Sequence, residues 1–156
     1  MSTDSKQGTL PFVSLRLLNA WRMGRSQRQY FIDDLQSFAW VLLWSALEIQ
    51  STKLKADLDD GMASRWRHDL HALTMQTCVQ FKKSIWYEVS SALRGVMPIP
   101  DEVLGVFRKW FELCYAFQVT DDELDRMEAE ERKRPNIYQQ MVDVALKALP
   151  KAPDAW

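Results

Sequence analysis

The order of apolar and polar positions predicts a chain made mostly of helices. From Leu35 to Ile49 nearly every position is apolar, which is typical of a central helix buried on most of its faces. A second apolar pattern recurs at helical spacing from Trp66 to Leu93 and predicts one long helix. After Gly95, Pro98 and Pro100, a third pattern begins at Asp101. No stretch alternates as a strand would, so the predicted fold class is all-α.

Shorter elements flank these helices. Ser14 is a good N-cap for a short helix that runs to about Trp21. Thr120 and Glu123 have the spacing of a capping box and predict a solvated helix after them. Pro135 suits the first turn of a last helix. We expect residues 1–8 to be a disordered N-terminus, residues 9–150 to form one domain and residues 151–156 to be a tail.

Composition narrows the classes of partner. The 156 residues are 47% hydrophobic, with 20 basic and 21 acidic side chains and a net charge of -1, so no overall field draws the chain to nucleic acid or to an anionic membrane. The N-terminus lacks the apolar core of a signal peptide, and the longest apolar run, Phe38 to Ala46, is too short to span a bilayer. We expect an intracellular protein, cytoplasmic or nuclear, that does not associate with membranes.

The sequence gives little support for a metal site. Cys78 and Cys114 fall in separate apolar stretches and are expected to be buried free thiols. His68, His71 and Cys78 could share one helical face, but a fourth ligand and a CxxC motif are missing. These patterns favour packing or surface roles over a zinc site, and no metal or cofactor is predicted for this chain.

Two segments resemble a known family. GTLPFVS at Gly8–Ser14 and DDLQSFAWVLLW at Asp33–Trp44 are similar to the end of the activation segment and the following buried helix of fungal-type protein kinases. Near the end, Arg134-Pro135 before IYQQMVDVAL resembles the Arg-Pro that opens the last helix of many kinase large lobes. The resemblance implies that residues 9–150 are the C-terminal part of a protein-kinase-like large lobe.

The resemblance also implies roles for particular residues. Thr9 would belong to the substrate-docking loop that contacts the catalytic aspartate. Asp34 would cap the central helix and brace the backbone of the catalytic loop, although it also suits an ordinary N-cap. The general kinase pattern departs at Ala-Pro-Glu, where this chain has Ser14, Leu15 and Arg16. Arg16 and Arg134 would be like charges, so this segment needs a nearby Asp or Glu to anchor it.

The parts that perform phosphoryl transfer are not recognisable. The five glycines cannot make a GxGxxG loop, no Asp-Phe-Gly occurs, and Arg67-His68-Asp69 lacks the metal-binding Asn expected five residues after its aspartate. In the family these parts precede the position of Gly8, so the chain is expected to be truncated upstream. We assign no catalytic residue, and ATP and magnesium are expected only for an intact family member.

Three functional hypotheses follow. The first is a fragment or degenerate member of a family that phosphorylates protein Ser or Thr with ATP, inactive alone and prone to self-association through apolar residues such as Phe38, Trp40 and Trp44. The second is a helical protein-interaction module, a pseudokinase remnant. The third is nucleic-acid binding, which the balanced charge disfavours; its candidate residues are Arg16, Arg22, Arg25 and Arg28, with Trp21 and Tyr30.

Overall fold

The structure, a computed structural model, describes residues 10–53, 62–71, 74–90, 99–114 and 119–148. Within these ranges the regular elements are all helical, which confirms the predicted fold class. They are the 3-10 helix η1 (Leu10–Phe12) and the α-helices α1 (Leu15–Arg22), α2 (Phe31–Lys53), α3 (Met62–Leu70), α4 (Met75–Ser90), α5 (Asp101–Leu113), α6 (Asp121–Lys133) and α7 (Ile137–Ala148). The expectations for residues 1–8 and 151–156 fall outside the described residues.

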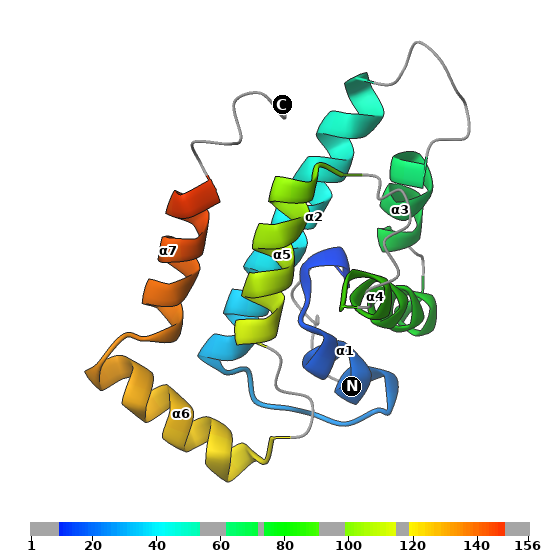
Figure 1. The fold of residues 1–156 in the computed structure, drawn as a ribbon. Coiled ribbons are helices and arrows are strands. Elements are labelled where there is room, and N and C mark those ends of the chain that lie inside the picture. The colour runs from blue at the N-terminus through cyan, green and yellow to red at the C-terminus, as the bar shows by residue number, and fades with distance from the viewer. Residues whose placement is uncertain (1–9, 54–61, 72–73, 91–98, 115–118, 149–156) are drawn as a thin grey trace.

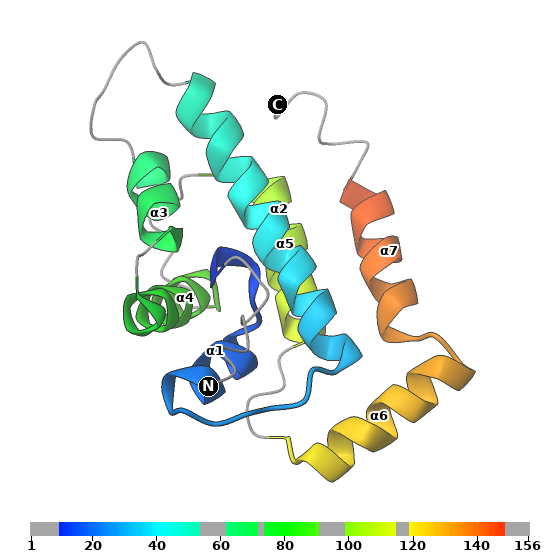
Figure 2. The ribbon, with the colours of Figure 1, turned by 180° about the vertical axis from the view of Figure 1, so that it is seen from behind.

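The long helix α2 is the centre of the fold (Figure 1). It packs against α5 along its length and against α3, while α7 packs on α5 and α1 packs on α4. Seen from both sides, α7 lies on one side of the α2–α5 pair, and α3 and α4 lie on the other (Figure 2). Helix α6 lies across the end of the molecule where α2 begins.

The core between α2 and α5 is aromatic. The ring of Trp40 is fully buried and lies 5.5 Å from the ring centroid of Phe107 and 5.0 Å from that of Phe111. Burying side chains of this size stabilises a fold by about 1.5–3 kcal/mol each. The expectation that Trp40 is exposed was therefore wrong. Phe38 is 57% exposed, as expected, and Trp44 is partly buried beside Phe12 and His71.

The long helix predicted from Trp66 to Leu93 is interrupted. Helix α3 ends at Leu70 and α4 begins at Met75. The hydroxyl of Thr74 accepts a hydrogen bond from the backbone N–H of Thr77 at 3.2 Å, which is the contact of an N-cap and starts a new helix. Leu93 lies outside the described residues.

Two of the N-caps expected from the sequence, Ser14 and Thr120, are confirmed. The Ser14 hydroxyl accepts from the backbone N–H of Leu17 at 3.2 Å, at the start of α1. Thr120 and Glu123 form a reciprocal capping box at the start of α6. Hydrogen bonds from Thr120 lower the pKa of the Glu123 carboxyl, because they stabilise its charged form.

Candidate functional site

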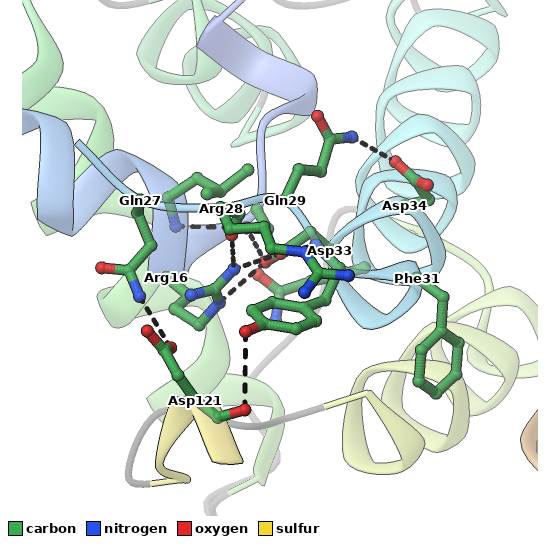
Figure 3. A network of polar contacts seen from close by, with 12 residues as sticks. Arg16, Gln27, Arg28, Gln29, Phe31, Asp33, Asp34 and Asp121 are labelled. Atoms are coloured by element: carbon green, nitrogen blue, oxygen red, sulfur yellow. Dashed lines mark hydrogen bonds and ion pairs between the residues drawn. The ribbon is translucent and has the colours of Figure 1, made fainter. Parts of the chain in front are cut away.

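A buried polar network joins the start of α1 to the start of α2 (Figure 3). Its centre is the carboxylate of Asp33, which is 2% exposed. The Ser14 hydroxyl donates to Asp33 Oδ1 at 2.6 Å, Arg16 Nε donates to the same oxygen at 3.1 Å, and Arg16 Nη2 forms an ion pair with Oδ2. The backbone N–H of Tyr30 donates to Oδ2 at 2.9 Å. Because each oxygen has partners, the buried charge of Asp33 is well satisfied.

The local sequence explains why these groups meet. The Ser14 hydroxyl both caps the start of α1 and donates to Asp33, so one side chain starts α1 and binds α2. Gln36 lies three residues further along α2 and accepts a hydrogen bond from the backbone N–H of Leu15. Its amide nitrogen donates to the carbonyl oxygen of Cys114 at 3.5 Å, just after α5. The network therefore connects three helices.

An outer set of charges ties the network to α6. The ring of Tyr30 is close to two guanidinium groups, with its centroid 5.2 Å from the Arg16 carbon and 4.8 Å from that of Arg28. Arg28 forms ion pairs with Asp125 at 2.8 Å and with Glu128 at 3.1 Å. Burial raises the pKa of Tyr30, so the phenol remains protonated near neutral pH. Solvent weakens the pairs of the half-exposed Arg28, so they align α6 more than they stabilise it.

A buried lysine of α4 binds the segment that precedes α1. Lys82 of α4 is fully buried, and its Nζ donates to the carbonyl oxygens of Val13 and Leu10. The Nζ atom also lies 4.6 Å from the ring centroid of Trp40, where the face of the ring attracts a cation. Burial lowers the pKa of Lys82 to about 7. Residues 10–14 are thus fixed between α2 and α4.

The acidic residue singled out from the sequence is not at the centre of this network. Asp34 is exposed, and its carboxylate accepts a hydrogen bond from Gln29 (Figure 3). The contact with a backbone N–H at the start of α2, expected of Asp34, is made by Asp33 to Tyr30. Adjacent residues on a helix are about 100° apart, so only one of the two aspartates faces α1.

The structure also contains the acidic partner that Arg16 was expected to need. Arg16 has a buried acidic partner in Asp33, which supplies the carboxylate that the sequence required. Arg134 is exposed at the end of α6, where its backbone N–H donates to the carbonyl oxygen of Glu130 at 2.9 Å. Thr9 lies outside the described residues.

Glu131 has a structural role that the sequence reading missed. Its side chain is buried at the end of α6 and accepts hydrogen bonds from the backbone N–H groups of Asn136, Ile137 and Tyr138, at 2.9, 3.1 and 3.0 Å. A carboxylate at a helix N-terminus satisfies free donors and interacts well with the helix dipole. Pro135 precedes α7, which begins at Ile137, instead of lying in its first turn.

The candidate zinc ligands do not come together. His71 packs edge-on against Trp44, with ring centroids 4.3 Å apart, and the thiol of Cys78 faces the carbonyl oxygen of Leu10. Across the residues that the structure describes, no group of three His, Cys, Asp or Glu side chains could hold a metal ion. Burial raises the pKa of Cys78 and raises that of Cys114 to about 12, so both thiols stay protonated and unreactive.

Three of the four arginines proposed for nucleic-acid binding contact other side chains. Arg16 and Arg28 pair with carboxylates, and Arg22 donates to the amide oxygen of Gln76 at 2.8 Å. The two carboxylate pairs leave less positive charge for phosphate groups than the sequence suggests. In the described part of the chain, no helix has both the length and the apolar character needed to cross a membrane.

Comparisons with known proteins add no relative. No family model matches the chain, and no curated protein or solved structure is similar to it. A functional proposal therefore has to rest on the residues of the chain itself.

Proposed function

We propose that this chain is the C-terminal part of a fungal-type protein kinase large lobe, and that alone it binds protein and does not transfer phosphate. The observation that carries the proposal is the contact between the two segments that resemble the family. Ser14 and Arg16, at the end of the activation-like segment, both bind Asp33 at the start of the central helix. This contact makes the two segments neighbours in space, which supports the view that they are parts of one lobe.

The position of Asp34 supports the same proposal. Its carboxylate is exposed beside the buried network, with a neutral amide from Gln29 as its partner. The family resemblance implies that this carboxylate accepts backbone N–H groups from the catalytic loop. An exposed acceptor beside a rigid network suits that role, because the network fixes the direction of the Asp34 carboxylate before that carboxylate binds the loop.

Phosphoryl transfer by the chain alone is not part of the proposal. The reaction depends on positioning the phosphates and neutralising their charge, and the sequence patterns for those tasks are missing. The test is incubation of the purified chain with labelled Mg-ATP and a general Ser/Thr substrate, with thermal unfolding measured at saturating Mg-ATP. We expect no incorporation and no rise in Tm. Incorporation that survives repeated purification would overturn the proposal.

A free-standing interaction module is the second candidate. It is favoured by the continuous aromatic core of α2 and α5, since a piece with such a core can fold by itself. The discriminating measurement is urea unfolding of the isolated chain. One cooperative transition, seen alike by circular dichroism and tryptophan fluorescence, supports the module, and a broad non-coincident transition supports a fragment that needs its missing half.

A further inference from the structure

A buried amine without an acidic partner lies against the segment that precedes α1. Lys82 of α4 is 0% exposed, and within the described ranges no carboxylate forms an ion pair with its Nζ atom. Its partners are the carbonyl oxygens of Leu10 and Val13 and the ring face of Trp40. Carbonyl dipoles and a ring face offset only part of the cost of taking a positive charge out of water. The folded chain therefore bears a cost whenever Lys82 is protonated.

The charged groups around α4 do not remove this cost. Cys78, one turn before Lys82 on the same helix, is the titratable group whose charge acts on the amine. Burial raises the pKa of the Cys78 thiol, so the thiol stays neutral and supplies no counter-charge. On α1, α2, α3 and α5, the charged side chains that the structure describes are exposed or paired with one another. The pairs are Arg16 with Asp33, Arg67 with Glu48, and Arg108 with Glu112.

A short strap, residues 10–13, lies against both Lys82 and Cys78. The thiol of Cys78 donates to the carbonyl oxygen of Leu10 at 3.6 Å, and Lys82 Nζ donates to the same oxygen at 3.4 Å. The strap ends at Ser14, whose hydroxyl is bound to Asp33 of α2. Because this anchor does not involve α4, the strap can leave α4 while Ser14 stays in place.

We propose that the strap is a pH-dependent closure, which stays on α4 while the Lys82 amine is neutral and opens more often when the amine is protonated. Opening lets water solvate the ammonium group, so the open form does not bear the cost of the buried charge. A neutral amine has no such cost and still donates to the two carbonyl oxygens of the strap. This inference goes beyond the proposed function and does not depend on the kinase resemblance, so either can fail alone.

The lysine determines the sign of the effect. Burial lowers the pKa of Lys82 from 10.5 to about 7 in the closed form, and water restores the ordinary pKa in the open form. Between these two values the open form binds more protons, so acidification favours opening. The open population should rise roughly tenfold from pH 9 to pH 8, about fivefold from pH 8 to pH 7, and less than about twofold from pH 7 to pH 6.

Slow alkylation of Cys78 measures the opening, because its thiol lies against the same strap. The full chain is treated with iodoacetamide between about pH 6 and pH 9, and mass spectrometry gives the rate at each cysteine. Each rate is divided by that of the same cysteine in urea at the same pH, which removes the effect of pH on the thiolate itself. We expect the ratio for Cys78 to rise roughly fiftyfold from pH 9 to pH 7 and then to level off. The ratio for Cys114, which only wider unfolding exposes, should be at least about tenfold lower at every pH.

Two lysine variants identify the group that titrates. Lys82→Met keeps an unbranched side chain in the core and removes the amine, so the Cys78 ratio should become independent of pH. Lys83→Met, on the exposed surface of the same helix, is the matched control and should keep the wild-type pH dependence. Circular dichroism establishes that each variant is folded. The two cysteines of the wild type test the proposal without any variant.

Three results would overturn the proposal. The first is a wild-type Cys78 ratio that does not change with pH. The second is a pH dependence that survives in folded Lys82→Met. The third is an equal ratio for Cys78 and Cys114 at every pH, because the thiols would then become accessible through global unfolding and not through release of the strap.

Discussion

Removing the charge of Asp33 should cost far more stability than removing that of its neighbour. Asp33→Asn deletes the negative partner of Arg16 in a site where the two side chains are 2% and 12% exposed. Breaking a buried ion pair from one side costs about 3–5 kcal/mol. Asparagine keeps one acceptor oxygen, so we expect a loss near 3 kcal/mol, a large share of the roughly 5–15 kcal/mol that stabilises a typical domain.

The adjacent residue provides the matched control. Asp34→Asn removes the same charge from an exposed side chain, and its effect should stay within about 0.5 kcal/mol. For a chain of this length, the loss of about 3 kcal/mol in Asp33→Asn corresponds to a fall in Tm of roughly 6–12 °C. Urea unfolding followed by circular dichroism measures both variants with the same assay.

A double-mutant cycle identifies the cause. Arg16→Met should cost less than Asp33→Asn, because Asp33 keeps its bonds from Ser14 and Tyr30. The variant with both changes should cost less than the two single changes added together, because it buries no orphan charge. If Asp33→Asn cost no more than Asp34→Asn, or if the two single changes were additive, the anchoring role given to this network would be wrong.

Three further outcomes follow from the buried groups. Because the pKa of Lys82 falls from 10.5 to about 7 on folding, the free energy of unfolding should rise between about pH 7 and pH 10, by up to about 1.4 kcal/mol per pH unit, and Lys82→Met should flatten that rise. Glu131→Ala should cost about 1–2 kcal/mol and speed hydrogen exchange at the start of α7, whereas Glu130→Ala should not. Cys78 and Cys114 should resist iodoacetamide in the native protein and react in urea; rapid native alkylation would contradict their burial.

Local sequence patterns predicted the start of a helix well where a single capping residue determines it. The hydroxyls of Ser14 and Thr120 start α1 and α6 as expected, because capping depends on a short polar side chain at a fixed spacing. The division of α3 from α4 was missed because apolar residues keep their helical spacing across it. The capping hydroxyl of Thr74 became evident only in three dimensions.

The site was harder to predict than the helices. The sequence pointed to Asp34 as the cap of the central helix, but which of Asp33 and Asp34 faces α1 depends on the rotation of α2 against its neighbours. Lys82 sits inside the apolar pattern of α4, and its burial depends on carbonyl oxygens about 70 residues earlier in the chain. Such long-range partners leave no periodic signal in the sequence.

Exposure along the central helix was predicted in part. Phe38, Trp40 and Trp44 were expected to share exposed surface, yet Trp40 is fully buried between α5 and Lys82 of α4. Phe38 lines an apolar groove between α2 and α7 and stays exposed. A helix that is apolar on nearly every face cannot show which face its neighbours leave uncovered.

Splitting a kinase domain is the sharpest test of whether this chain is part of a kinase large lobe. An intact fungal-type kinase would be cut before its activation-segment end, and its front part co-expressed with this chain. We expect a complex that phosphorylates a Ser/Thr substrate, and we expect Asp34→Ala to abolish this activity while Asp143→Ala leaves it unchanged. Failure of the two parts to associate, or activity indifferent to Asp34→Ala, would contradict the assignment of this chain to a kinase large lobe.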